Sequence, residues 1–547
     1  MGVTASTVRV GKRYRHHRLD RDYDAIVIGS GIGGLTSAAC LAKMGKKVCV
    51  LEQHYTAGGF THTYERNGYE WDVGVHYIGD VGNKKTTSRR LFDYITDGEL
   101  KWSAMDHTFD RIFIGKETFN LNSGRAAYRQ GLIDAFPDEE SAIDEYLKRM
   151  RSLKGAVQTH TLQKILPTWL NYIVDLFTKN KRPASFEQTT REVLEEITDN
   201  QMLIALMTSQ WGDCGMPPGE SSFVIHSLIA QHYMNGGYYP NGGAAEIAKK
   251  IIPIIQSAGG DVFTYASVEK IMTNKNRANG VLMSDGNIIK APAIISNAGV
   301  FNTFTKLLDD TLPQVDDYQK KLTQVKPSMG SICLYIGIKD TADNLKLPKT
   351  NFWIYPNEHY EQVCDQFKSD TQYNENITLP MVYISFPSAK DPDFSRRYPG
   401  RATIEIVAPC RHEWFAEWKH QPWGNRGADY ESLKEALSQR LLKELYKKLP
   451  QLNEKIDYYE LSTTLSTDFF CRYSQGEIYG IDHDPKRFKQ SWLKPKTTIN
   501  GLYLTGQDVV TCGVVGAMMA GLITSVKIGK LQGLKLAKTI FFPSADS

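Results

Sequence analysis

One stretch near the N-terminus, "DAIVIGSGIGGLTSAACLAKMGKKVCVLE" at residues 24–52, constrains the fold more than any other part of the chain. The apolar run at 24–28 predicts a short buried strand, and the segment 46–52 predicts a second one. Between them, the small and apolar side chains of residues 35–42 predict a helix packed closely against a sheet. The order strand, glycine-rich turn, helix and strand indicates a βαβ unit of an α/β fold.

The glycines of this turn have a spacing that is typical of dinucleotide binding. Gly29, Gly31 and Gly34 form the pattern G-x-G-x-x-G, and Glu52 follows at the end of the second predicted strand. In such a unit the first glycine permits a tight turn, the second lets a pyrophosphate approach the backbone, and the third lets helix and strand touch. The helix N-terminus then points free N–H groups at the phosphates, and we expect Glu52 to accept hydrogen bonds from a ribose.

Two further glycine-rich segments decide between NAD and FAD. Gly58 and Gly59 follow the acidic residue closely, although alone they would indicate an ordinary turn. Far away in the sequence, residues 501–506 predict another strand, followed by Asp508 and by a glycine-rich helix start at 513–516. Together these segments favour one composite site for FAD, the larger dinucleotide. We expect the second helix dipole to face the electron-rich flavin ring and Asp508 to hold the ribityl chain.

The composition bounds what else the chain can be. With 547 residues it is too long for one ordinary core, so we expect two or more domains. Hydrophobic residues make up 41% and charged residues 23%, which is typical of a globular protein. A net charge of +4 is too small to indicate nucleic acid, and we expect no such partner. The eight cysteines form no CxxC pair, which favours a reducing compartment and predicts neither a disulfide scaffold nor a metal site.

The first 21 residues bear on membrane attachment. No apolar core of a secretory signal is visible in them. "MGVTAS" matches the acylation pattern M-G-x-x-x-[ST], which also arises by chance, so acylation of Gly2 is left open. The basic run "RVGKRYRHHRLDR" would supply a second membrane signal, and we assign residues 1–21 to a basic N-terminal tail.

Two apolar segments could contact a membrane. The uncharged run at 509–526 is long enough to span one, but its place behind the glycine-rich turn favours a buried helix. Near 160–180, bulky apolar residues at helical spacing are flanked by cations, which suits a helix in the headgroup plane as well as a core helix. The apolar set is Leu162, Ile165, Leu166, Trp169, Leu170, Ile173, Leu176 and Phe177, and the cations are Lys164, Lys179, Lys181 and Arg182.

Four segments together resemble one known family. They are "GSGIGG…LEQHYTAGGFTHT", "WDVGVHYIG", "GGYYPNGG" and "LYLTGQDVVTCGVVGA", spread over nearly the whole chain. They resemble the FAD-dependent phytoene desaturase superfamily, and within it they are most similar to the retinol saturases and the carotenoid isomerases. Bacterial phytoene desaturases usually have an arginine just after the double glycine, where this chain has Phe60-Thr61-His62-Thr63. "GEIYGIDHD" also resembles the saturase branch.

The resemblance implies an α/β fold with a Rossmann-like FAD-binding domain of the glutathione-reductase type and a second, α+β substrate domain. The FAD-binding domain would be discontinuous, assembled from 22–100, 235–300 and 490–535. The substrate domain would take 101–234 and 301–489. The residues agree with this division, since "SICLYIGIK", "MVYISF" and "ATIEIVAP" predict strands and "YESLKEALSQRLLKELYKKL" predicts an amphipathic helix.

The predicted FAD-binding positions come from the motifs and from this resemblance, which places Val268 where backbone groups hold the adenine edge. The set is Gly29, Ser30, Gly31, Ile32, Gly33, Gly34, Glu52, Gln53, Gly58, Gly59, Phe60, Thr61, Val268, Gly506, Asp508, Gly513, Val515 and Gly516. No separate second Rossmann unit is visible for NAD(P)H. The electron donor is therefore either a transient partner or NAD(P)H that reaches the flavin briefly.

A flavin can pass a hydride to a conjugated double bond, and saturation of that bond also needs an acid near the ring. His76 and Tyr77 in "VGVHYIG" are the first candidates, because the surrounding glycines indicate a loop against the flavin. Tyr479 and His483 are further candidates. Each of these residues could equally be a structural tyrosine or a satisfied histidine. We do not expect a covalent flavin link through Cys512, since buried cysteine is usually inert.

Three functions remain open at this point. The first is FAD-dependent reduction of a double bond in a retinoid or another isoprenoid polyene, similar to retinol saturase. The second is cis–trans isomerisation or desaturation of a polyene, and the third is non-catalytic escort of a prenyl lipid, which does without an intact flavin site. The intact glycines, Glu52 and Asp508 favour an enzyme. We expect an apolar polyene substrate and peripheral association with the cytoplasmic side of a membrane, and we make no prediction of the oligomeric state.

Overall fold

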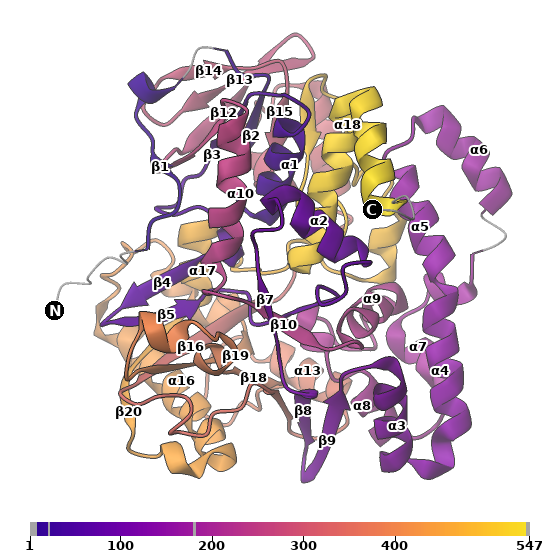
Figure 1. Ribbon diagram of the computed structural model, residues 1–547, viewed down its shortest axis with the longest axis vertical. Helices are drawn as coiled ribbons and strands as arrows, with labels where there is room; N and C mark the ends of the chain where they lie inside the picture. Colours follow the sequence, from indigo (N-terminus) through magenta and orange to yellow (C-terminus); the bar gives the residue numbers. More distant parts are fainter. Residues whose placement is uncertain (1–7, 20–21, 179–181, 543–547) are drawn as a thin grey trace.

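A computed structural model describes residues 8–19, 22–178 and 182–542, and it contains the expected βαβ unit (Figure 1). Strands β2 (Ala25–Ile28) and β3 (Val48–Leu51) pair in parallel, and α1 (Ile32–Ala42) connects them. Every residue of α1 is buried, because α10 (Ala245–Ser257) and α18 (Gly513–Phe541) pack against it. The small side chains of this helix are what permit such close packing.

Six parallel strands form the sheet that carries this unit, in the order β1-β11-β3-β2-β15-β21. The added strands are β1 (Lys12–Arg13), β11 (Asp261–Thr264), β15 (Ile294–Ser296) and β21 (Leu502–Leu504). Strands β11, β15 and β21 come from segments far apart in the chain that the resemblance assigned to one domain, and Figure 1 labels β2, β3 and β15 of this sheet. In such open parallel sheets, ligands bind outside the carboxyl ends of the strands.

The basic N-terminal segment contributes to this sheet, whereas the sequence predicted only a tail at 1–21. Strand β1 (Lys12–Arg13) pairs in parallel with β11, and Lys12 forms an ion pair with Asp261. The open edge of the sheet supplies the hydrogen bonds that hold a segment without any apolar pattern. Gly2 and the acylation pattern lie outside the described residues.

A second sheet of seven strands, in the order β20-β16-β19-β18-β17-β8-β9, forms the wall of the other domain. Neighbouring strands are antiparallel except β17 and β8. The strands are β8 (Thr108–Ile114), β9 (Glu117–Asn122), β16 (Gly330–Ile338), β17 (Asn351–Tyr355), β18 (Val382–Ser385), β19 (Ala402–Cys410) and β20 (Ile456–Ser462).

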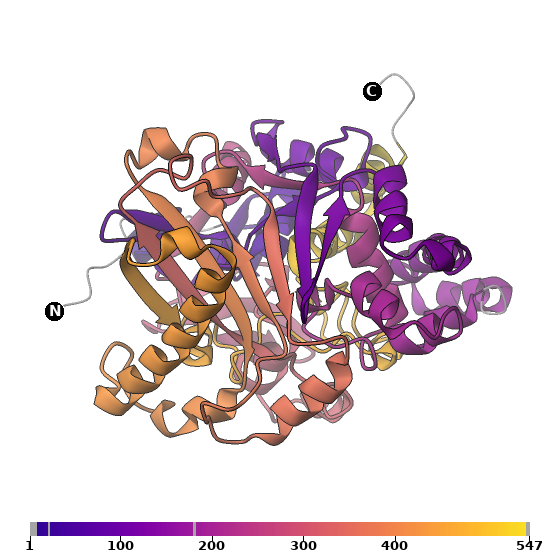
Figure 2. The ribbon, with the colours of Figure 1, turned by 90° about the horizontal axis from the view of Figure 1, so that it is seen from below.

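The two faces of this sheet serve different purposes because side chains alternate along each strand. On one face, Ile332, Ile384 and Ile406 pack in a core with the apolar side of α16 (Gly427–Lys448), which crosses the strands in Figure 2. On the other face, Tyr383 and Val407 line a cavity. The predicted strands and amphipathic helix of this region are therefore present, and the sheet presents one face to the site.

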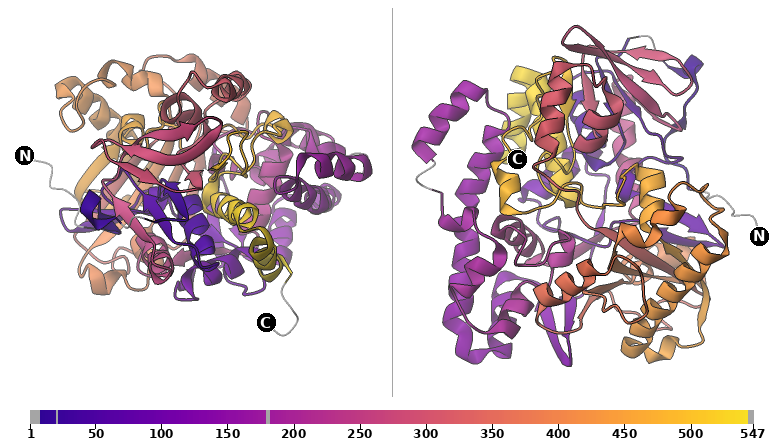
Figure 3. Two further views of the ribbon diagram at one scale, coloured as in Figure 1. Left: turned by 90° about the horizontal axis from the view of Figure 1, so that it is seen from above. Right: turned by 180° about the vertical axis from the view of Figure 1, so that it is seen from behind.

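Smaller elements join the two domains and cover them. Three small sheets are formed by β4 (Thr63–Arg66) and β5 (Tyr69–Asp72), by β6 (Ile78–Gly79), β10 (Gly237–Pro240) and β7 (Trp102–Ala104), and by β12 (Val268–Asn274), β13 (Arg277–Met283) and β14 (Ile288–Lys290). A helical layer along one side of the molecule (Figure 3, right) consists of α3 (Arg125–Ala135), α4 (Glu140–Ser152), α5 (Lys154–Gln163), α6 (Thr168–Thr178), α7 (Thr190–Glu195), α8 (Gln201–Met207) and α9 (Phe223–Tyr233). The remaining α-helices are α2 (Thr87–Thr96), α11 (Val300–Asn302), α12 (Pro313–Leu322), α13 (Tyr360–Ser369), α14 (Pro387–Lys390), α15 (Phe394–Arg397) and α17 (Thr464–Cys471).

The apolar stretch near 160–180 forms two helices, whereas its spacing predicted one. Helices α5 and α6 are separated at Pro167, which lacks a backbone N–H and disfavours helical geometry in the residue before it. Lys164 is not part of a cationic fringe, because its Nζ donates to the Leu493 carbonyl at 2.8 Å in a partly buried position. Lys179 and Lys181 lie outside the described residues, as does the side chain of Trp169.

The uncharged run at 509–526 enters α18, as predicted. Residues Ala520 to Val526 are buried, and α1 packs along this part of the helix. Among the described residues, α18 is the helix that is long and apolar enough to cross a membrane, and half of its apolar window is buried within the protein. Its first half is thus a core helix of the domain built on the six-stranded sheet.

Candidate functional site

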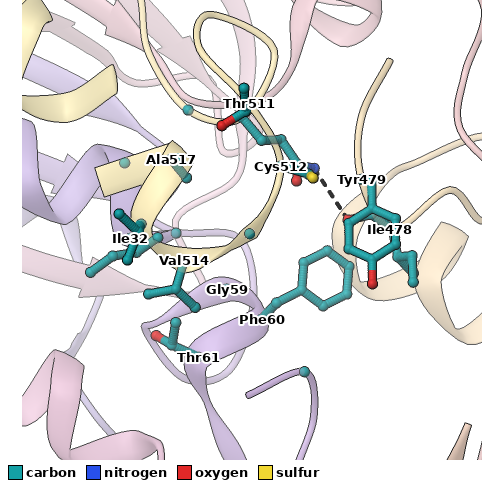
Figure 4. A pocket seen from close by; sticks show the side chains of 18 of the residues that line it. Ile32, Gly59, Phe60, Thr61, Ile478, Tyr479, Thr511, Cys512, Val514 and Ala517 are labelled. Atoms are coloured by element: carbon teal, nitrogen blue, oxygen red, sulfur yellow. Dashed lines mark hydrogen bonds between the residues drawn. The ribbon is translucent and has the colours of Figure 1, made fainter. Parts of the chain in front are cut away.

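A cavity of about 1350 Å³ is lined by residues of both domains (Figure 4). Pockets for one drug-sized ligand typically measure about 300–1000 Å³. The volume is therefore enough for a dinucleotide together with a second molecule. The carboxyl ends of β2, β3, β15 and β21 lead into the lining segments, which is where a parallel sheet of this type binds its ligand.

All predicted FAD-binding positions except Ser30 and Gly34 line this cavity. The backbone N–H and the hydroxyl of Ser30 donate to Glu52 Oε2, at 2.8 and 2.7 Å. A Cβ on Gly34 would lie 2.2 Å from the Gly29 carbonyl oxygen, so this glycine permits the contact between strand and helix. Both residues stabilise the glycine-rich turn without lining the cavity. That the lining residues bind FAD stays a prediction.

The N-terminus of α1 is free to receive an anion. Gly31 is its N-cap and offers no side chain to the first N–H groups of the helix, which therefore have no partner inside the helix. Gly58 forms a parallel bridge to Gly31, and a Cβ on Gly59 would lie 2.8 Å from the Gly31 Cα. Gly58 and Gly59 thus lie directly against the backbone of Gly31. Together they form a bare backbone cradle at a positive helix end, which fits a pyrophosphate.

The N-terminus of α18 reaches the same cavity. Its N-cap, Cys512, makes no capping bond from its side chain, and Gly513 (φ +77°) has open space where a Cβ would be. Figure 4 shows Val514 opposite Thr61, with the ring of Phe60 pointing toward Tyr479. Two uncapped helix N-termini at one cavity fit a ligand with a pyrophosphate at one end and an electron-rich ring at the other, as FAD has.

The two acidic residues predicted to bind FAD, Asp508 and Glu52, accept backbone hydrogen bonds from neighbouring segments. Asp508 Oδ2 accepts the N–H of Val300 at 2.8 Å, and its Oδ1 accepts the N–H of Ile481 at 3.1 Å. Glu52 Oε1 accepts the N–H of His54 at 2.8 Å. An oxygen that accepts only one of these hydrogen bonds keeps a free lone pair. Asp508 and Glu52 can therefore also accept hydrogen bonds from a ribityl chain and a ribose.

His76 lines the cavity, but it is held in a neutral form. Its Nδ1 lies 2.8 Å from Glu405 Oε2, and burial lowers the pKa of the imidazole to about 4. Burial also raises the pKa of Glu405 to about 8. A neutral imidazole at neutral pH is a weak proton donor. The geometry therefore favours a positioning role for His76, through its contact with Glu405 of the seven-stranded sheet, over the role of proton donor.

Tyr77 also lines the cavity, with its hydroxyl directed into a polar network. The hydroxyl donates to Asp110 Oδ2 at 3.0 Å, and its ring stacks on Tyr233 with centroids 4.1 Å apart. Burial raises the pKa of Tyr77 well above its ordinary value. Asp110 also accepts hydrogen bonds from Gln210 and Asn351, both at 2.9 Å. Tyr77 thus forms part of the cavity wall, and its hydroxyl proton is used in the hydrogen bond to Asp110.

The other two predicted acids differ from each other. Tyr479 lines the cavity and lies beside Cys512 in Figure 4. His483 does not line it, and its fully buried Nε2 accepts the N–H of Cys512 at 2.8 Å. The structure thus places His483 behind the cavity wall, and its role as a catalytic acid stays a prediction. This histidine fixes the start of α18, a contact between distant segments that loop composition could not reveal.

Several residues of the site were missed in the sequence. Asn297 packs against Gly31, Gly33 and Gly506, with its side-chain atoms within 3 Å of the Cβ position of each. The signal that could have pointed to it is the small-residue segment "SNAG" at 296–299. Asp213 lines the cavity, and its Oδ2 is buried without a hydrogen-bond partner among the described residues. The surrounding "QWGDCG" matches no motif, so no local signal pointed to it.

Comparison with known proteins agrees with this site. The family model described as flavin-containing amine oxidoreductase matches residues 32–528. The chain is 37% identical to all-trans-retinol 13,14-reductase of Danio rerio, over 96% of this chain and 89% of the relative. It is 27% identical to the chloroplastic prolycopene isomerase of Daucus carota, over 94% and 81%. Among solved structures, cyclohexylamine oxidase from Brevibacterium oxydans has a TM-score of 0.58 at 16% identity, over 94% of this chain and 100% of that one, which shows the shared fold.

Proposed function

The chain belongs to the flavin-containing amine oxidoreductase family, and we propose that it reduces a carbon–carbon double bond of a retinoid with FAD as its cofactor. The observation that carries this proposal is the cavity itself. Its glycine cradle and two helix N-termini fit FAD, and the volume beyond them is bounded by apolar and aromatic side chains. The retinol 13,14-reductase relatives, which match over nearly the whole chain, support the substrate class.

The protein's own residues bind and orient the cofactor. The α1 N-terminus and the glycines Gly31 and Gly59 would receive the pyrophosphate, Glu52 the adenosine ribose, and the α18 N-terminus the ring. When bound, FAD supplies the hydride for the double bond in its reduced form. Reduction further requires that water is kept from the reacting carbons and that a proton arrives at one of them.

The chamber that would hold the polyene is made of rigid apolar walls. Tyr77 stacks on Tyr233, Tyr383 packs on Trp353 with centroids 4.6 Å apart, and Met381 packs in the same core. Helix α9 adds Val224, Ile225, Leu228 and Ile229 to the lining. Such walls bury a conjugated chain without demanding hydrogen bonds from it, and they exclude water. These features match an apolar polyene better than a charged amine.

The reaction can be tested without knowledge of the physiological donor. The purified protein is reduced anaerobically with dithionite, mixed with all-trans-retinol and related polyenes, and the products are analysed by mass. A product that has gained two hydrogen atoms supports reduction. A product of unchanged mass with altered retention indicates isomerisation, and a lighter product formed only with oxidised flavin indicates desaturation. A yellow protein that converts no polyene would contradict the substrate class. NAD(P)H is assayed as electron donor in parallel.

We also propose that the substrate enters from a membrane surface. Helix α5 lines the cavity with one face, through Lys154, Val157, Gln158 and Thr161 at helical spacing. Leu162 at the end of α5 is 50% exposed, and on α6 Leu176 is 63% and Phe177 71% exposed. Exposed apolar residues next to a cavity lining are suited to a lipid surface.

Cations at the solvent-exposed part of the cavity lining support this proposal. Arg125, Arg151 and Lys154 line the cavity and are exposed to solvent, so the cavity reaches the surface among them. They would face anionic headgroups while α6 inserts its apolar side chains. Lys527 of α18 donates to the Ile165 carbonyl at 2.6 Å, which anchors the link between α5 and α6 to the FAD-binding domain.

Liposome sedimentation tests the membrane proposal. The double substitution Leu176→Glu and Phe177→Glu should reduce binding to vesicles that contain anionic lipid, because both side chains are exposed and their loss leaves the core intact. Ile288→Glu is the matched control, since Ile288 is 48% exposed on β14, far from α6 in Figure 1. Binding that is unchanged in the double variant, or equally weakened in the control, would contradict a docking role of α6.

A further inference from the structure

Asp213 combines features that no other carboxyl among the described cavity residues shares. It ends a short 3-10 helix at Trp211–Asp213, and its backbone carbonyl accepts the Cys512 thiol at 3.4 Å. It therefore lies at the start of α18, where the flavin ring is expected. Its side chain lines the cavity, and Oδ2 is shielded without a hydrogen-bond partner among the described residues. Burying an ionised carboxylate is strongly disfavoured when one of its oxygens has no donor.

The neighbouring carboxyl, Asp110, is also buried, and burial raises its pKa to about 6. It differs from Asp213 in accepting three hydrogen bonds, from the Tyr77 hydroxyl, Gln210 and Asn351, and Lys390 lies close enough to favour its charge. These contacts limit the rise, so Asp110 is ionised at neutral pH. A negative charge there raises the pKa of Asp213 beyond the rise that burial causes, and Tyr77 offsets only part of it. Two nearby carboxyls with such different surroundings are typical of one charged and one proton-holding group.

Among the described residues, no cation is found among the groups that interact with Asp213. The titratable groups that interact with it are Asp110, Tyr77, Tyr233, Tyr355, Tyr383, Tyr479, Cys214 and Cys512. Burial raises the pKa of each of these five tyrosines and two cysteines above its ordinary value, so all seven stay neutral. Asp110 is then the charged neighbour, and it opposes a second negative charge.

We propose that Asp213 is the proton donor of the double-bond reduction, an inference that rests on the proposed function. The polyene would lie between the flavin ring at the α18 N-terminus and the aromatic walls, with one alkene carbon facing the Asp213 carboxyl. Reduced FAD would supply the hydride for a C–H bond at the other alkene carbon and would leave oxidised. The O–H bond of Asp213 would break, and its proton would form the second C–H bond, so that the substrate gains two hydrogens. Asp213 would remain as a carboxylate and regain a proton from water between turnovers.

The first experiment compares single turnovers of flavin-loaded variants after anaerobic reduction, with all-trans-retinol as the probe. Asp213→Asn keeps the shape of the side chain but has no acidic proton, so product formation should fall about 100-fold or more. Bound flavin and thermal stability should be retained. Asp213→Glu restores an acid and should recover part of the rate. Asp80→Asn is the matched control, because Asp80 lines the same cavity and burial raises its pKa as well.

The second experiment reads the proton directly and does not depend on turnover. The infrared difference spectrum between wild type and Asp213→Asn, recorded on oxidised flavin-loaded protein at neutral pH, should show the carbonyl band of a protonated carboxylic acid. The same difference for an ionised group would show carboxylate bands instead. Asp213 in the carboxylate form at neutral pH would overturn the inference.

The outcomes separate this inference from the proposed function. If wild type reduces retinol and Asp213→Asn does so within threefold of the same rate, Asp213 is not the donor and the proposed function stands. If Asp80→Asn loses as much activity as Asp213→Asn, the effect belongs to the cavity in general and the assignment fails. If wild type converts no polyene, the proposed function fails, and with it the role assigned to Asp213, whatever the infrared spectrum shows of its proton.

Discussion

Replacing Gly59 by alanine tests whether the second glycine pair is part of the FAD cradle. Gly59 has φ +56°, and a Cβ there would lie 2.8 Å from the Gly31 Cα, a backbone atom that cannot rotate away. A left-handed alanine costs about 1–2 kcal/mol. An overpacked methyl group against a fixed neighbour costs about 1–3 kcal/mol more. The sum of these two effects is about 2–5 kcal/mol.

This strain should reduce the affinity for FAD more than it lowers the stability of the free protein. The free protein can relieve it by moving the loop at Gly58–Thr61 away from the N-terminus of α1, whereas binding would bring the loop back. Because about 1.4 kcal/mol corresponds to a factor of ten, the Kd for FAD should rise roughly 30-fold to 4000-fold. The assay titrates the flavin-free protein with FAD and measures binding as quenching of the flavin fluorescence.

Gly45→Ala is the matched control for this substitution. Gly45 has φ +77° and nothing within 4 Å of its Cβ position, so alanine meets the same backbone penalty without a clash. It should lower the free energy of unfolding by about 1–2 kcal/mol and leave the Kd for FAD unchanged. A folded Gly59→Ala protein whose Kd lies within threefold of wild type would refute the reasoning about the glycine cradle.

Three further predictions concern the same structure. Cys512→Ser should retain flavin, and the wild type should release FAD on heat denaturation, because burial raises the pKa of this thiol and keeps it unreactive; flavin left on the precipitate would contradict this. Glu52→Ala leaves the N–H groups of Ser30 and His54 without their acceptor, at about 1–3 kcal/mol for each group that stays buried, so the visible absorbance per protein should fall. Lys164 has its pKa lowered by burial, with Arg487 adding to the effect, from 10.5 to about 7. The unfolded chain therefore holds this proton to higher pH than the folded one. The free energy of unfolding should rise between pH 7 and 10.5 by up to about 1.4 kcal/mol per pH unit, and Lys164→Met should remove that slope in denaturant titrations.

The FAD-binding half of the protein could be predicted well from the sequence because its signals are local. The strand, the glycine spacing and the small residues of α1 follow one another within 24–52, and each has one mechanical purpose. The resemblance assigned 235–300 and 490–535 to the same domain, and the segments 261–264, 294–296 and 502–504 within these ranges do form strands of its sheet. Here the backbone geometry is set by residue type, above all by glycine where no side chain fits.

The chemistry of the chamber was decided by the tertiary structure. His76 and His483 were both candidate acids in the sequence, yet one lines the cavity beside Glu405 and the other accepts the N–H of Cys512 behind it. Asp213 had no motif, and it gains its surroundings only because Asp110 and the start of α18 meet it in the fold. The sequence by itself determined a Rossmann-type FAD domain, since backbone shape depends on near neighbours. Which acid keeps its proton depends on burial and on charges from distant segments, and these exist only once the chain has folded.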